Sequence, residues 1–199
     1  MEELKPFLIT FVVLFVVIGV FYLIFQNAGP LFMKAPSEQP QAVSTKTMGT
    51  LTIKSSAFKN NDPIPAKYTC DGDNVNPLIE ILNVPKEAKS LALVMDDPDA
   101  TGGVTWDHWL VWNINPQTNY IEEDNLPQGA IEGKTSFGKS SYGGPCPPRG
   151  SKQHRYMFKV YALNIMLGLM EGEGKTELTK AMEGHVLAEG TLIGLYQRK

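Results

Sequence analysis

The stretch that most restricts the fold of this chain is residues 138–163, GKSSYGGPCPPRGSKQHRYMFKVYAL. Its first half cannot form a helix or a regular strand. The two adjacent glycines open backbone conformations that a side chain forbids, and the three prolines each fix φ and remove an N–H donor. Its second half, residues 155–163, is rich in β-branched and aromatic residues and predicts a strand. We therefore expect a rigid loop that leads directly into a strand.

The alternation of side chains along that strand places a histidine and a tyrosine together. His154, Tyr156 and Phe158 have the same parity, so all three point to one face. A histidine held on a strand, next to a loop with exposed backbone N–H groups, indicates a site for a small ligand. The alternative is a turn rich in proline and glycine before an ordinary strand, with Arg155 in solvent.

Composition excludes several classes of protein. The chain has 199 residues and a net charge of −3, which argues against nucleic acid as the main partner because a phosphate backbone requires a basic face. Cys70 and Cys146 are the two cysteines, too few for a disulfide-rich scaffold or a four-cysteine zinc site. Nothing in the sequence indicates a cofactor.

The amino-terminal region predicts a membrane anchor. Residues 7–25 form an uncharged apolar run whose length as a helix, roughly 28 Å, matches the hydrocarbon core of a bilayer. A secretory signal peptide is the rival interpretation, but its apolar region is shorter and ends at a small-residue cleavage site. We expect a transmembrane anchor at residues 1–26, a flexible linker at residues 27–48, and an extracytoplasmic domain at residues 49–199 of a single-pass membrane protein.

The remaining residues predict a mainly β domain. Strands are expected near residues 51–55, 77–82, 91–95, 106–114, 155–163 and 191–196, a short extended piece at 64–68, and a helix at 176–184. The run at 91–95 is apolar throughout, which is typical of a strand buried on both faces. The pattern favours an antiparallel two-sheet β-sandwich with Greek-key connections and one or two short helices.

Four segments taken together resemble one known family. They are Asp97-Pro98-Asp99-Ala100, Trp106-x-His108-Trp109-Leu110-Val111-x-Asn113, Gly143-Gly144-Pro145-x-Pro147-Pro148 and His154-Arg155-Tyr156. They are similar to the phosphatidylethanolamine-binding protein family, in its bacterial and archaeal branch, which is often labelled Raf-kinase-inhibitor-like. The resemblance covers residues 51–198. The chain departs from the family pattern at Thr101, where proline is common.

The resemblance implies a β-sandwich with a small pocket for phosphate-type anions or phospholipid head groups. Its wall would consist of Asp97, Pro98, Trp106, His108, Gly143, Gly144, Pro145, His154 and Tyr156. In this arrangement the two histidines would supply ring donors, and the two-glycine turn would present backbone N–H groups as an anion nest. Cys70 and Cys146 lie in loops of the family signature. They would form a disulfide in an oxidising compartment, and two separate thiols are the alternative.

The functional expectation is a membrane-tethered binding or regulatory module, not an enzyme, that inhibits a kinase or a protease as its protein partner. The alternative is a hydrolase. Asp97, His108 and His154 would then form a metal triad, or Ser140 or Ser141 would act as a nucleophile with His154 and Asp97. Neither serine lies in a nucleophile-elbow motif, which favours the binding module.

Overall fold

The computed structural model describes residues 48–199. The predicted anchor at residues 1–26 and the predicted linker up to residue 47 lie outside the described residues. Within residues 48–199, no helix has the length and apolar character needed to cross a bilayer.

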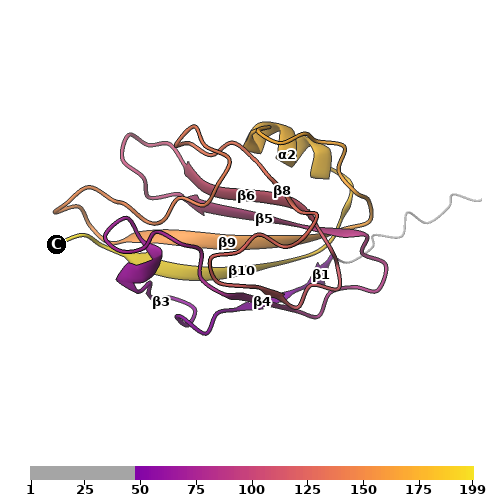
Figure 1. The fold of residues 1–199 in the computed structure, drawn as a ribbon, viewed down its shortest axis with the longest axis horizontal. Helices are drawn as coiled ribbons and strands as arrows, with labels where there is room; N and C mark the ends of the chain where they lie inside the picture. The colour runs from indigo at the N-terminus through magenta and orange to yellow at the C-terminus, as the bar shows by residue number, and fades with distance from the viewer. Residues whose placement is uncertain (1–47) are drawn as a thin grey trace, which may run out of the picture. The chain divides into compact units, whose positions relative to one another are not determined.

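Two β-sheets and one α-helix make up the described domain (Figure 1). The large sheet has the order β1-β10-β9-β5-β6-β8, with β3 also paired to β10. Its strands are β1 (Gly49–Thr50), β3 (Asp62–Pro63), β5 (Ser90–Asp97), β6 (Trp106–Ile114), β8 (Ile131–Glu132), β9 (His154–Leu163) and β10 (Val186–Tyr196). The small sheet contains β2 (Thr52–Lys54), β4 (Ile79–Leu82) and β7 (Tyr120–Ile121). The 3₁₀ helix η1 spans Ala66–Tyr68, and α2 spans Lys175–Met182.

This architecture confirms the mainly β, two-sheet prediction, and it has a single short α-helix. Two details differ. The pairing is not purely antiparallel, because β1 and β3 each run parallel to the same edge of β10. The last three residues of the segment predicted as extended at residues 64–68 form η1 instead, and the backbone N–H and the hydroxyl of Thr69 both donate to the carbonyl oxygen of Ala66. A threonine that bonds back to a nearby carbonyl offers the backbone this alternative to a strand.

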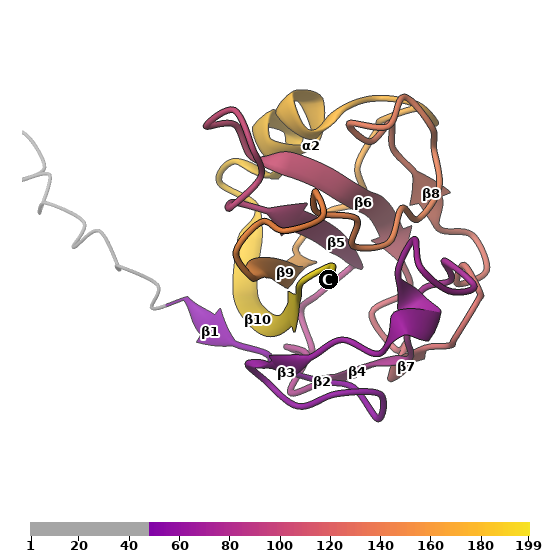
Figure 2. The same ribbon diagram turned by 90° about the vertical axis from the view of Figure 1, so that its left-hand side faces the viewer.

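The large sheet lies between the small sheet and α2, so it separates two hydrophobic cores (Figure 2). In β5, Leu91, Leu93 and Met95 pack in the core shared with the small sheet. Ala92 and Val94 pack in the core beneath α2. Every residue of β5 is buried, as its continuous apolar run predicts.

A β-bulge in β6 changes which face its first residues reach. Met95 of β5 pairs with Trp109, but the next residue, Asp96, pairs with Asp107. His108 is therefore the extra residue on the bulged strand, and a bulge of this kind re-aims the neighbouring side chains. Asp107 consequently meets Lys175 of α2, whereas His108 lies on the other face, against Tyr156.

Candidate functional site

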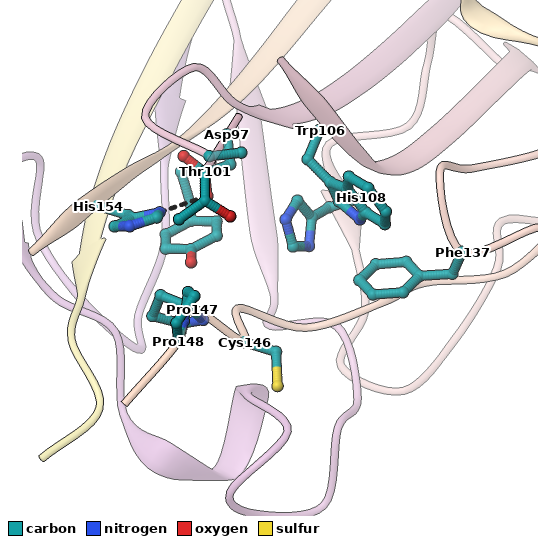
Figure 3. A pocket seen from close by; sticks show the side chains of 11 residues that line it. Asp97, Thr101, Trp106, His108, Phe137, Cys146, Pro147, Pro148 and His154 are labelled. Atoms are coloured by element: carbon teal, nitrogen blue, oxygen red, sulfur yellow. Dashed lines mark hydrogen bonds and ion pairs between the residues drawn. The ribbon is translucent and has the colours of Figure 1, made fainter. Parts of the chain in front are cut away.

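A cavity of about 210 Å³ opens at one end of the large sheet. There the carboxyl-terminal end of β5 meets the amino-terminal ends of β6 and β9, because both are antiparallel neighbours of β5. The cavity is lined by Asp97, Ala100, Thr101, Trp106, His108, Phe137, Cys146, Pro147, Pro148, His154 and Tyr156 (Figure 3).

The first polar element of the cavity is a buried carboxylate–imidazole pair. The Nδ1–H of His154 donates to Oδ2 of Asp97 at 2.7 Å, and the backbone N–H of Asp99 donates to Oδ1 at 2.8 Å. Both side chains are at most 4% exposed. This arrangement, in which both oxygens of Asp97 accept, places the ring proton of His154 on Nδ1. Nε2 is then the ring nitrogen that remains for a ligand.

The second polar element is His108, whose ring is held in the same tautomer by a different acceptor. Its Nδ1–H donates to the carbonyl oxygen of Gly143 at 2.6 Å. Burial lowers the pKa of His108, which favours the neutral ring. In that form Nε2 carries a lone pair and accepts rather than donates a hydrogen bond.

Tyr156 lies between the two imidazoles on the floor of the cavity. Its ring stacks against His154 with centroids 6.5 Å apart and meets the edge of His108 at 5.1 Å. The hydroxyl is buried and forms no hydrogen bond of good geometry with the described residues, although the carboxylate of Asp97 and the backbone of Cys146 lie close to it. Burial raises the pKa of Tyr156, so this hydroxyl keeps its proton and can donate.

An ion pair anchors the loop that follows β5 at the cavity mouth. Arg155 forms two hydrogen bonds to the carboxylate of Asp99, through Nε at 2.7 Å and NH2 at 2.9 Å. The Arg155 guanidinium lowers the pKa of Asp99 to about 2. The side chain of Arg155 is half exposed, but its guanidinium forms a bidentate ion pair with Asp99.

The two-glycine turn is not the anion nest that the sequence predicted. The N–H of Gly143 donates to the carbonyl oxygen of His108 at 2.9 Å, and the N–H of Gly144 donates to Oδ1 of Asn74 at 2.8 Å. These glycines are needed for close packing instead. A Cβ at residue 143 would lie 2.5 Å from the Phe137 ring, and one at residue 144 would lie 2.5 Å from the carbonyl oxygen of Tyr68.

The predicted wall is brought together in part. Asp97, Trp106, His108, His154 and Tyr156 line the cavity. The predicted residues that lie outside its lining are Pro98, Gly143, Gly144 and Pro145. In their place are Ala100, Thr101, Phe137, Cys146, Pro147 and Pro148. Most of these belong to the quoted motifs or adjoin them, but Phe137 lies in a polar loop where no sequence signal marks it.

The two cysteines are joined beside the cavity. Cys70 and Cys146 form a disulfide with an S–S distance of 2.05 Å. This bond ties the loop before Asn74 to the proline-rich segment that closes the cavity.

Asp97, His108 and His154 line one cavity, but the described residues do not show the arrangement that either hydrolase alternative needs. Within residues 48–199, no three side chains of histidine, cysteine, aspartate or glutamate are arranged to hold a metal ion. Neither Ser140 nor Ser141 lines the cavity that contains His154.

Comparison with known proteins gives a consistent set of relatives. A family model described as phosphatidylethanolamine-binding protein matches residues 54–197. A UPF0098 protein of Pyrococcus horikoshii is 50% identical over 151 residues, covering 73% of this chain and 76% of the relative. A UPF0098 protein of Methanothermobacter thermautotrophicus is 47% identical over 153 residues, covering 74% and 99%.

Two solved structures of similar proteins point to the same family. A crystal structure from Chlamydia trachomatis, described as a putative phosphatidylethanolamine-binding protein homolog, is 37% identical with a TM-score of 0.71, covering 76% of this chain and 99% of that one. A structure from Escherichia coli, described as a new member of the mammalian family, is 29% identical with a TM-score of 0.72, covering 76% and 100%. The motifs, the two-sheet fold and these matches together lead to one conclusion: the chain belongs to the phosphatidylethanolamine-binding protein family.

Proposed function

We propose that this protein binds a phosphate-type head group in the cavity between His108 and His154 and takes up protons as it does so. The observation that carries the proposal is the convergence of two tautomer-fixed imidazoles with the unpartnered hydroxyl of Tyr156. A buried hydroxyl without a partner is costly, so an acceptor oxygen from a ligand would relieve it. Trp106 supplies an apolar wall at the mouth.

The charges of the cavity determine which protonation state binds. Asp97 is negative, and each neutral imidazole would present an Nε2 lone pair to the ligand. A phosphate dianion would then face one negative charge and two acceptors, which is unfavourable. Protonation of the imidazoles converts Nε2 into a donor and offsets the charge of Asp97. Binding of a phosphate dianion therefore requires about one added proton, on a ring nitrogen or on a phosphate oxygen.

Calorimetry with phosphoethanolamine tests both parts of this proposal. Measurement at one pH in buffers of different ionisation enthalpy yields the number of protons taken up, which we expect to be about one. Hydrogen bonds to a charged group contribute about 1.5–3 kcal/mol, so His154→Ala should weaken binding about tenfold to a hundredfold. His185→Ala is the matched control, because His185 bonds to Asn164 and lies outside the cavity lining.

Two outcomes would contradict the proposal. Equal affinity in the wild type and His154→Ala would show that the ligand binds elsewhere. Tight binding without proton uptake, and with no dependence on pH between about 6 and 8, would contradict the role of the two rings.

We also propose that residues 1–26 anchor the protein in a membrane and that the domain lies in an extracytoplasmic, oxidising compartment. The uncharged run at residues 7–25 supports the anchor, and the Cys70–Cys146 bond supports the compartment. The full-length protein should stay with membranes after alkaline carbonate washing, and added protease should digest the domain in spheroplasts of an expression host. Two free thiols under denaturing, non-reducing conditions would argue against the oxidising compartment.

A further inference from the structure

A second cavity, of about 310 Å³, adjoins the first. It is lined by Cys70, Asn74, Thr135, Phe137, Lys139, Ser141, Tyr142, Gly143, Gly144 and Cys146. The two cavities share Phe137 and Cys146 as walls. In Figure 3 the Phe137 ring stands at the side of the first cavity, beyond His108, with Cys146 below it. The two cavities are therefore neighbours, with Phe137 and Cys146 between them.

The Phe137 ring lies between the two cavities and is fixed by contacts with its neighbours. Its ring meets Trp106 at 5.5 Å and His108 at 5.3 Å, both edge to face. The turn that carries it is fixed to β6, because the N–H of Ser136 donates to the carbonyl oxygen of Asp107 and the Ser136 hydroxyl accepts from the N–H of Asp107. The ring is nevertheless 42% exposed. An exposed, held aromatic ring between two cavities offers an apolar surface to the middle of a ligand.

The donors in the second cavity determine what the far end of such a ligand should be. The hydroxyl groups of Thr135 and Tyr142 already donate to backbone carbonyl oxygens. Lys139 is exposed, and within residues 48–199 it forms no ion pair with a carboxylate. Lys139 is the one cationic residue among the described residues that line this cavity, so its charge favours an anionic acceptor there and disfavours the ammonium group of an ethanolamine head group.

We propose that the ligand is a phosphate ester that also carries a carboxylate. The phosphate lies between the two histidines, a short apolar segment crosses Phe137, and the carboxylate reaches Lys139. This inference rests on the proposed function, because the first cavity must hold the phosphate. The chemistry is shared by free carboxylated phosphate esters and by carboxylated phospholipid head groups.

The test uses the full-length protein in a nonionic detergent and pairs of synthetic probes. Each pair consists of an ω-phosphonoalkanoate with about two to six methylene groups and the alkylphosphonate of the same length, which lacks the carboxylate. Inorganic phosphate probes the first cavity alone. We expect one chain length at which the carboxylate strengthens binding about three- to fivefold, as an exposed ion pair contributes up to about 1 kcal/mol. Lys139→Ala should remove this gain and leave phosphate affinity unchanged, and Lys139→Arg should keep it.

The outcomes separate this inference from the proposed function. If inorganic phosphate does not bind, the proposed function has failed. If phosphate binds but no carboxylate probe exceeds its alkyl partner, or if the gain survives in Lys139→Ala, the second cavity is not a ligand subsite and the inference is wrong. Dihexanoyl phosphatidylserine compared with O-phosphoserine then identifies the source. If the lipid binds and Lys139→Ala weakens its binding, the ligand is a phospholipid head group. If Lys139 strengthens binding of the free ester only, the ligand is a soluble molecule.

Discussion

Asp96 and Asp97 are adjacent in β5, are both at most 3% exposed, and point to opposite faces of the large sheet. Asp97 faces the cavity, where its partner is the imidazole of His154. Asp96 faces α2, where Oδ2 accepts from the ammonium groups of Lys159 and Lys175, each at 2.8 Å. Lys175 also donates to Asp107, so four charges form one neutral cluster behind the cavity.

The two faces differ in the groups that bond to the buried carboxylate: two ammonium groups on the side of α2 and an imidazole on the side of the cavity. Burial alone would lower the pKa of Lys175, but its hydrogen bonds to Asp107 and Asp96 outweigh burial and raise it. Lys175 therefore keeps its charge at neutral pH, and its bonds to Asp96 and Asp107 tie α2 to the sheet. The cavity face contains the imidazoles of His154 and His108, and burial lowers the pKa of His108. Asp96 belongs to a charged cluster that ties α2 to the sheet, and Asp97 holds the imidazole of His154 in the cavity.

The largest effect is expected when the cluster behind the sheet is broken. Asp96→Ala leaves two partly buried ammonium groups without their shared partner and should reduce the free energy of unfolding by about 2–4 kcal/mol. Because Asp96 faces away from the cavity, phosphate affinity of the folded protein should be unchanged. Urea unfolding measures the first quantity and calorimetry the second. Glu189→Ala, an exposed carboxylate in β10 of the same sheet, is the control and should change stability by less than about 0.5 kcal/mol.

Asp97→Asn should strengthen phosphate binding, because it removes a negative charge beside the anion and changes the ring nitrogen of His154 that carries the proton. The N–H of Asp99 still requires an acceptor at Oδ1, so the amide NH₂ faces His154 and Nδ1 must accept its hydrogen. The ring proton then moves to Nε2, where it can donate to a ligand without proton uptake. We expect phosphate affinity at about pH 8 to rise severalfold to tenfold, with proton uptake reduced by about one. Uptake equal to that of the wild type would refute this reasoning.

The smallest effect concerns stability and pH. Burial lowers the pKa of His108 in the folded state, so below its unfolded value of about 6.5 the unfolded chain binds more protons than the folded one. Without ligand, stability should therefore fall as pH decreases from about 7 to about 5.5, with a slope of at most about 1.4 kcal/mol per pH unit. In His108→Asn the side chain can still donate to the carbonyl oxygen of Gly143, but the part of the pH dependence of stability that comes from His108 should be absent. The comparison requires urea unfolding of both proteins across that range; parallel curves would contradict it.

Much of the scaffold could be predicted from residue patterns. The continuous apolar run of β5 indicated a strand covered on both sides, and Trp106–Ile114 is a strand with the predicted limits. Short edge pairings could not be predicted, because β1 and β3 are two-residue strands whose parallel partner, β10, is more than a hundred residues away in the sequence. No local pattern encodes such a contact.

The candidate site was predictable where it depends on side-chain parity and not where it depends on packing. The common face of His154 and Tyr156 follows from alternation along β9, and both line the cavity. The role of Gly143 could not be deduced, since glycine serves equally in an anion nest and in a close contact. The position of the Phe137 ring, which a Cβ at residue 143 would approach to 2.5 Å, decides between them.

By itself, the sequence determined the chemical groups of the site and the strands that carry them, because residue type and alternation are local properties. The tertiary structure alone decided which face His108 reaches. Without the bulge in β6, strand alternation would place His108 on the same side as Leu110 and Trp112, beneath α2, and Asp107 on the side of the cavity. The bulge is a property of the pairing between β5 and β6, and it puts the second imidazole beside Tyr156 and leaves Asp107 to Lys175.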